Sequence, residues 1–538
     1  MQEMKKQNFL KGAAILAAAS IFVKIIGAVY KIPIFNILDD EGIGYFQVTY
    51  NIYTLILTIS TAGVPVALSR LVSSAAARGD NGLVKRYFKV SLPAFMIIGA
   101  VAMAVMLLFA DTFARLMNSS PAAAGVRTLA PAVFFVCIIS VYRGYAQGFE
   151  NMIPTAMSQV VEVVCKAAFG IAAAMWLMSI GSESHIVSAG AIMGVTIGLG
   201  LCIPLLIWYK RKLDRGFSFP GDTAGQPGRL SVFGRLMKVS IPITLSASFL
   251  SIMIVIDTSI ILGRLQTSLH YTEGEANALF SIFTRGLTIY NLPPAIIIPL
   301  AVSIVPAIAS ALTKNREDEA KDIMRSSIKL NNLLTMPACA GIMALSGPIL
   351  VALYGDSRQT TSIVLVILGA ASFFVCLQHI TLAILQANGH EKLAMLTFPI
   401  GALFRIVFSF VLVGNPNIGI LGSPVGTLAC FVVMSALNII FILTKVKARD
   451  KISSTFAKPL LCTAVMAVAA YFVYKLLYMA GSGIIGTGRM AVCVYLGASI
   501  VVGVVVYVVL IIATRTLTTK DMKLVPKGDK LAKLLRIK

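Results

Sequence analysis

Six ionisable residues lie deep inside long apolar stretches of this 538-residue sequence: Lys24, Lys166, Arg285 and Arg405 are basic, and Glu162 and Asp257 are acidic. At a rise of about 1.5 Å per residue, most of them fall roughly 12 to 21 Å from a helix end, near the middle of a bilayer. An ionisable side chain there costs about 2.5–3.5 kcal/mol or more, so it normally faces a bundle interior or water. The surplus of positive charge predicts a cavity for an anionic ligand, and arginine suits a phosphate because it can bind bidentately.

Structural interpretations of some of these charges are also open. Glu162 and Lys166 are four residues apart on one predicted helix, so they can form an ion pair that only orders packing. Such a pair does not account for the other three basic residues, which have no acidic neighbour in their own spans. Lys31 and Arg143 lie nearer the ends of their spans, where long basic side chains reach the headgroups.

The composition indicates an all-α integral membrane protein. The chain is 57% hydrophobic and only 13% charged, with a mean hydropathy of +0.86, against about 25% charged residues in soluble domains. A hydrocarbon core about 30 Å thick takes roughly 20 residues per helix, which predicts fourteen spans. They are residues 10–37, 45–69, 88–110, 128–147, 154–178, 186–209, 237–263, 276–308, 329–353, 359–386, 391–414, 417–444, 456–480 and 488–514.

The distribution of basic residues predicts the orientation of the chain. With the N-terminus inside, 34 of the 46 Lys and Arg residues fall in cytoplasmic segments, five fall in outer loops and seven fall within spans. This asymmetry follows the positive-inside rule and predicts that both termini are cytoplasmic. The net charge of +23 is therefore expected to meet anionic membrane lipids rather than nucleic acid.

An internal repeat relates the two halves of the chain. Gln147 precedes Lys166 by the same number of residues as Gln386 precedes Arg405, and the offset between the two pairs is close to 240 residues. Spans one to six then match spans seven to twelve, a parallel repeat of two bundles around a cavity, as in many secondary transporters. The predicted organisation is a lobe at 1–210, a cytoplasmic linker at 211–236, a lobe at 237–444, two extra spans within 445–514 and a basic tail at 515–538.

Asn291-Leu-Pro-Pro interrupts the predicted eighth span. Two prolines remove two backbone donors, which membranes tolerate where the backbone lines a cavity or is supported by another helix. We expect a functional bend there, because Arg285 is on the same span.

No residue pattern indicates an enzyme. The sequence lacks the zinc-protease, P-loop and paired-carboxylate signatures, and its eight cysteines lie singly, which predicts neither a metal site nor a disulfide framework. No cofactor is expected. Without an ATP motif, transport is expected to use a Na+ or H+ gradient, the membrane potential or the substrate gradient.

Four stretches resemble a known family. VYRGYAQGFENMIPTAMSQVVEVVCK (141–166), LAILQANGHEKLA (382–394), NLPPAIIIPLAVSIVPAIA (291–309) and FVKIIGAVYKIPIF (22–35) look like the polysaccharide transporter branch of the multidrug/oligosaccharidyl-lipid/polysaccharide exporter superfamily. Within it, the chain is most similar to the stage V sporulation protein B group, relatives of the MurJ lipid II flippases.

The resemblance implies a two-lobed bundle that flips an undecaprenyl-diphosphate-linked saccharide, most specifically lipid II, by alternating access. It implies diphosphate binding by Lys24, Arg70 and Arg285, and a groove for the polyprenyl tail at the last two spans. Asp257 matches an acidic residue that couples sodium in some relatives, although span eleven offers Arg405 where a carboxylate partner is expected. A monomer in the bacterial cytoplasmic membrane is expected.

Other functions remain open. The chain could export a different lipid-linked polysaccharide unit, or act as a membrane scaffold that recruits cell-wall or spore-envelope enzymes through its basic loops. A cation-drug antiporter of the same superfamily should have an acidic cavity, which the basic residues argue against. A membrane glycosyltransferase would need an acidic metal or nucleotide site, which the sequence does not offer.

Overall fold

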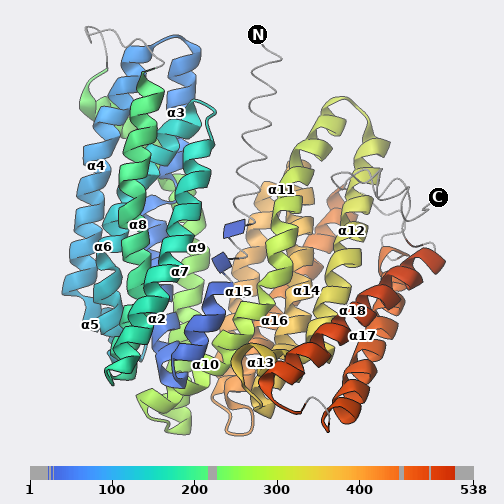
Figure 1. Ribbon diagram of the computed structural model, residues 1–538. Helices are drawn as coiled ribbons and strands as arrows, with labels where there is room; N and C mark the ends of the chain where they lie inside the picture. Colours follow the sequence, from blue (N-terminus) through green and yellow to red (C-terminus); the bar gives the residue numbers. More distant parts are fainter. Residues whose placement is uncertain are drawn as a thin grey trace. The chain divides into compact units, whose positions relative to one another are not determined.

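The computed structural model confirms the all-α membrane fold (Figure 1). It describes residues 22–23, 26–27, 29–215, 227–446, 454–483, 486–514 and 516. Within these residues, 12 helices are long and apolar enough to cross a membrane, and a bent pair raises the number to 13 if it is one span. Each predicted span from the second to the fourteenth has a counterpart among them. The first is described mainly at its end, where residues 29–37 are helical.

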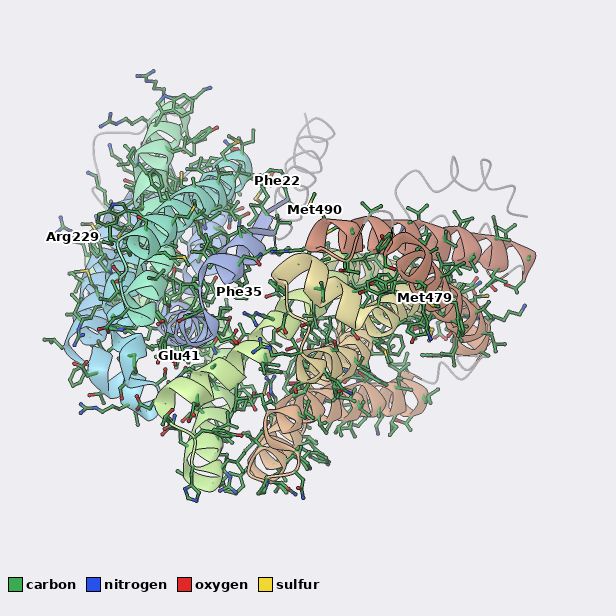
Figure 2. The ribbon with its side chains drawn as sticks, turned by 60° about the horizontal axis from the view of Figure 1, so that its bottom comes forward. Phe22, Phe35, Glu41, Arg229, Met479 and Met490 are labelled. Carbon is green, nitrogen blue, oxygen red and sulfur yellow. The ribbon has the colours of Figure 1, made fainter. Side chains whose placement is uncertain are left out.

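The chain divides into two compact units between Ser281 and Ile282. The first contains α2 (Asp40–Thr61), α3 (Val64–Ala77), α4 (Asn81–Leu108), α5 (Ala110–Leu116), α6 (Ala123–Gly148), α7 (Ile153–Ser179), α8 (Ser184–Asp214) and α9 (Arg229–Leu269). In this unit α8 packs against both α6 and α7, and α2 packs against α6 and α9. Phe35 lies near the end of the 29–37 helix and Glu41 near the start of α2 (Figure 2).

The second unit begins within α10 (Glu273–Tyr290). Its other helices are α11 (Leu292–Thr313), α12 (Glu317–Ala344), α13 (Ser346–Tyr354), α14 (Gln359–Ala387), α15 (Glu391–Val413), α16 (Gly422–Phe441), α17 (Ser454–Gly481) and α18 (Arg489–Ala513). The helix α14 packs against α11, α12 and α16, while α17 packs against α12 and α18. Met479 lies near the end of α17 and Met490 near the start of α18 (Figure 2).

The compact units do not coincide with the lobes expected from the repeat. The repeat assigns α9 to the second lobe, yet within the first unit α9 packs against α2, α3 and α4. Much of the expected 211–236 linker is helical, since α8 continues to Asp214 and α9 begins at Arg229. The division of the chain into functional lobes therefore stays a prediction.

Two of the predicted spans are each divided into two helices near a proline. The predicted eighth span consists of α10 and α11, with Asn291 between them and Pro293 at the start of α11, so the expected break is confirmed. The predicted ninth span consists of α12 and α13, which are bent by 76°. Pro348 explains this second break, because it lacks the N–H that would extend α12 and its ring clashes with the preceding turn.

Glycines on α8 bring the α7 backbone unusually close. A Cβ added at Gly194 would lie 2.4 Å from the Lys166 carbonyl oxygen, and one added at Gly198 would lie 2.8 Å from the Glu162 carbonyl oxygen. Small residues spaced by four let two helix backbones approach in a membrane, where van der Waals packing drives association. The positions of the candidate site residues Lys166 and Glu162 thus depend on Gly194 and Gly198, called here the glycine seam.

We expect Gly194→Ala to lower the free energy of unfolding by about 1–3 kcal/mol, the usual cost of overpacking. Gly200→Ala on the same helix is the matched control, because its Cβ would meet only the Phe135 ring, at 3.5 Å. Thermal unfolding of the purified protein in detergent measures both. Equal midpoints for the two variants would show that the seam does not fix α7.

Candidate functional site

A chain of side-chain hydrogen bonds crosses the first unit from the 29–37 helix to α9. The Lys31 ammonium donates to Gln47 Oε1 at 3.3 Å, and Gln47 Nε2 donates to Asn51 Oδ1 at 2.7 Å. Asn51 Nδ2 then donates to Thr258 Oγ1 on α9 at 2.9 Å. Lys31 was expected to reach the headgroups, but its ammonium instead donates to the Gln47 carboxamide of α2.

Lys31 and Lys166, called here the lysine pair, share one aromatic ring. The Lys166 Nζ lies 4.9 Å from the ring centre of Tyr50, and the Lys31 Nζ lies 5.8 Å from it. Tyr30 adds a second ring for Lys166 at 5.0 Å, and Phe35 adds one for Lys31 at 5.8 Å. Aromatic faces attract cations within about 6 Å without cancelling their charge. Both lysines are half-buried, and within the described residues neither has a carboxylate within ion-pair distance.

Glu162 forms its ion pair with Arg143 instead of Lys166. The Arg143 Nη2 lies 3.0 Å from Glu162 Oε2, and Arg143 Nε donates to Ser158 Oγ at 2.9 Å. The ion pair between Glu162 and Lys166, which the sequence left open as an alternative, does not form, and the expected headgroup role of Arg143 was wrong. A signal was present in the sequence: the turn at 149–152 joins the two helices, and Arg143 and Ser158 lie at similar distances from it.

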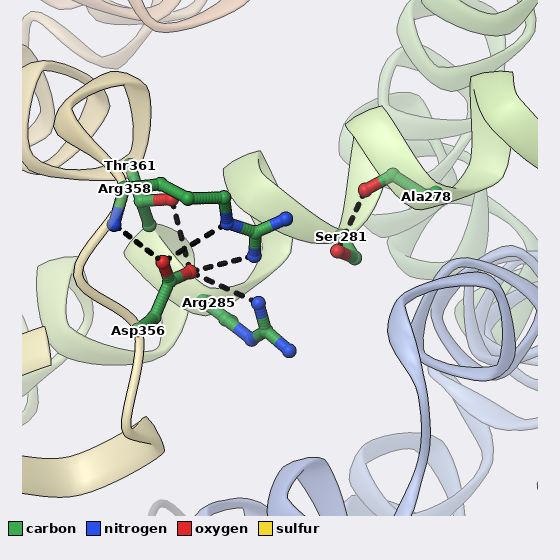
Figure 3. A network of polar contacts seen from close by, with 6 residues as sticks. All are labelled: Ala278, Ser281, Arg285, Asp356, Arg358 and Thr361. Carbon is green, nitrogen blue, oxygen red and sulfur yellow. Dashed lines mark hydrogen bonds and ion pairs between the residues drawn. The ribbon is translucent and has the colours of Figure 1, made fainter. Parts of the chain in front are cut away.

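In the second unit, Asp356 binds two arginines (Figure 3). Arg285 Nη1 lies 3.0 Å from Asp356 Oδ2, and both side chains are at least nine-tenths buried. Arg358 binds the same carboxylate bidentately, through Nε at 2.9 Å and Nη2 at 2.7 Å. Thr361 Oγ1 donates a further bond to Oδ2 at 3.0 Å. Arg285 has no acidic neighbour in its own predicted span, and the loop between α13 and α14 supplies this one.

The surroundings of Asp356 keep it ionised. Burial alone raises the pKa of this carboxyl, but the hydrogen bonds and charge of Arg358 and the Thr361 hydroxyl outweigh burial and lower the pKa to about 2. A carboxyl whose pKa is depressed on folding stabilises the folded state above its unfolded pKa of about 3.9, and this contribution is lost as the pH falls toward 2. The network therefore persists unchanged across the physiological range.

The remaining predicted site residues are dispersed. Arg70 is exposed on α3, and Asp257 is buried on α9 beside Thr258. Arg405 is buried on α15. Lys24 lies outside the described residues. Among the predicted residues, the structure brings together Glu162 and Lys166 in the first unit, and it adds Lys31, Tyr50 and Arg143 to them.

An apolar groove of about 600 Å³ lies in the second unit between α12, α17 and α18. Leu333 and Ile342 line it from α12, Met466 from α17, and Val504 and Ile511 from α18. This apolar lining suits a hydrocarbon chain.

In the part of the chain that the structure describes, no group of three or more His, Cys, Asp or Glu side chains could hold a metal ion.

We expect Asp356→Asn to lower the free energy of unfolding by about 3–5 kcal/mol, because breaking a buried ion pair leaves a charge uncompensated. Asp111→Asn is the matched control: its pair with Arg127 has side chains 57% and 50% exposed, and such pairs contribute about 0–1 kcal/mol. Thermal unfolding between pH 5 and 8 should show a constant difference between the variants. A difference that vanishes within this range would contradict the low pKa of Asp356.

Comparison with curated proteins of Bacillus subtilis (strain 168) gives matches over most of the chain. The chain is 26% identical over 535 residues to the uncharacterized membrane protein YabM, covering 99% of this chain and 98% of that protein. It is 27% identical to Stage V sporulation protein B, over 81% of this chain and 83% of that protein. It is 25% identical to the Lipid II flippase MurJ, over 76% and 77% respectively.

Solved structures share the fold. The inward closed conformation of the lipid II flippase MurJ aligns with a TM-score of 0.65 at 15% identity, covering 92% of this chain and 98% of that one. An inward-facing multidrug resistance transporter of the MATE family, in the MOP superfamily, aligns with a TM-score of 0.64 at 15% identity, covering 82% and 98%. Because the chain has many helices that could span a membrane and is similar to these membrane proteins, it is a multi-pass protein of the bacterial cytoplasmic membrane. Residues 9–312, more than half of the chain, match the family described as polysaccharide biosynthesis protein, and the chain belongs to that family.

Proposed function

We propose that the protein is a flippase that moves an undecaprenyl-diphosphate-linked saccharide across the cytoplasmic membrane by alternating access. Within this class of lipid, the substrate we propose is lipid II. The observation that carries the proposal is the lysine pair: two half-buried cations on different helices, positioned by aromatic rings and the Gln47 carboxamide, with no carboxylate in ion-pair contact among the described residues. A diphosphate supplies the negative charge that this arrangement lacks.

The second unit supports an anionic substrate too. Arg285 and Arg358 share the single carboxylate of Asp356, so this trio carries one net positive charge. Arg405 adds a further buried cation on α15. Charges of this kind inside a membrane protein normally mark a substrate pathway, and arginine can bind phosphate oxygens bidentately.

The apolar groove supports the lipid part of the substrate. Its lining is made of apolar residues and of Tyr507, whose hydroxyl donates a 2.8 Å hydrogen bond to the Leu333 carbonyl. A polyprenyl chain gains about 0.8 kcal/mol for each CH₂ group removed from water, but little when it merely leaves other lipid tails. The groove would therefore guide the tail rather than supply affinity.

The source of energy is proposed to be an ion gradient or the membrane potential. Asp257 is the candidate for ion coupling: it is 1% exposed on α9, next to the threonine that receives the hydrogen bond from Asn51. A proton or Na+ at this carboxylate would change the charge at the end of the chain of hydrogen bonds that begins at Lys31. Anionic lipids at the cytoplasmic surface remain the proposed partners of the basic loops.

Two other functions are kept as candidates. Export of a different lipid-linked glycan is favoured by the family itself and by a 24% match over 37% of this chain to the probable low-salt glycan biosynthesis flippase Agl15 of Haloferax volcanii. A scaffold for cell-wall or spore-envelope enzymes would use the basic loops and would not need the lysine pair.

Exposure of lipid II at the outer surface of cells depleted of related flippases tests the proposal. The unaltered protein should restore exposed lipid II, and Lys31→Ala and Lys166→Ala should each lower it at least tenfold at equal membrane levels, because each removes a cation from the diphosphate site. Lys212→Ala should behave as the unaltered protein: this lysine also lies over a ring, Trp208 at 5.4 Å, but at the exposed end of α8.

Two results would contradict the proposed flippase function. Full activity of both lysine variants would show that the lysine pair does not bind the diphosphate. Failure of the inserted, unaltered protein would exclude lipid II and leave another lipid-linked glycan or the scaffold role.

A further inference from the structure

Glu162 has two cations within reach and pairs with only one of them. Lys166 follows it by one helical turn on α7, a spacing at which Glu and Lys side chains commonly pair. Arg143 reaches it from α6, and the structure shows the ion pair with Arg143, at 3.0 Å. The Lys166 ammonium lies instead over the rings of Tyr30 and Tyr50.

Arg143 is anchored beside Glu162 by a second bond. Its Nε donates to Ser158 Oγ at 2.9 Å, and the Ser158 hydroxyl in turn donates to the Thr155 carbonyl at 2.9 Å. Ser158 is fully buried and precedes Glu162 by one turn on the same face of α7. The guanidinium is therefore fixed by one nitrogen while another binds the carboxylate, which lysine could not do with the same rigidity.

The consequence concerns the charge at Lys166. If Glu162 turned toward Lys166, the ammonium would be neutralised at short range and would attract an anion far less strongly. The Arg143 side chain is 16% exposed and that of Glu162 is 32% exposed, so solvent does not fully screen these charges.

We propose that Arg143 is a positioning residue that holds the Glu162 carboxylate away from Lys166 and so leaves the Lys166 charge available to the diphosphate of the substrate. This inference rests on the proposed function, in which Lys166 binds that diphosphate. Arg143 itself need not contact the ligand. Its role is to occupy a carboxylate that would otherwise compete for the site.

Binding of farnesyl diphosphate to the full-length protein in detergent tests the inference. Arg143→Gln should weaken binding at least tenfold, because the freed Glu162 then pairs with Lys166. Glu162→Gln should tighten binding, and the double variant Arg143→Gln/Glu162→Gln should bind at least as tightly as the unaltered protein. Arg127→Gln, on the same helix with an exposed partner, controls for the loss of an arginine.

The variants separate the outcomes. Weak binding by Arg143→Gln with recovery in the double variant supports the inference, and a structural defect at Arg143 would not be repaired this way. Unaltered binding by Arg143→Gln while Lys166→Gln binds weakly overturns it, as does a double variant as weak as Arg143→Gln. Unaltered binding by Lys166→Gln would instead refute the proposed diphosphate site. If Arg143→Gln does not fold, the inference requires the double variant and Glu162→Gln to bind equally.

Discussion

A cation inside a hydrocarbon layer must be stabilised by something, and the chemistry of what stabilises it decides whether it can still bind a ligand. The protein uses two different solutions. Arg285 is paired with the Asp356 carboxylate, which Arg358 also binds. Lys31 and Lys166 are held by rings and a carboxamide, which bear no formal charge. The first solution fixes both arginines and leaves one net positive charge on the three side chains, whereas the second leaves both positive charges for an anion.

Backbone packing provides the second condition. Gly194 and Gly198 allow the carbonyls of Lys166 and Glu162 to lie against α8, which fixes the depth and rotation of α7. The Tyr30 hydroxyl donates to the Ala191 carbonyl on α8 at 3.4 Å, so one ring of the lysine site is tied to the same helix. A site assembled from three helices thus obtains its geometry from one glycine seam, and any motion of α8 would move the lysine site with it.

The sequence predicted the helices better than it predicted the partners of their charges. Hydropathy reports whether a segment is apolar over about 20 residues, so the spans matched closely, and the Asn291-Leu-Pro-Pro break followed from proline chemistry. Ion pairs depend on which faces of different helices meet, and this depends on packing between residues distant in sequence. No sequence pattern links Asp356 to Arg285, because the two residues are 71 positions apart. The depth of Arg143 and Lys31 in their spans predicts contact with headgroups, but the partners of both side chains come from other helices.

The lysine pair is proposed to bind the diphosphate of a lipid-linked saccharide. A structure determined with such a lipid bound, for example by cryo-electron microscopy, tests it most directly. We expect diphosphate oxygens at about 2.7–3.2 Å from the Nζ atoms of both Lys31 and Lys166, the usual range for charge-assisted hydrogen bonds. A diphosphate bound elsewhere, with both ammonium groups still over Tyr50, would contradict the claim.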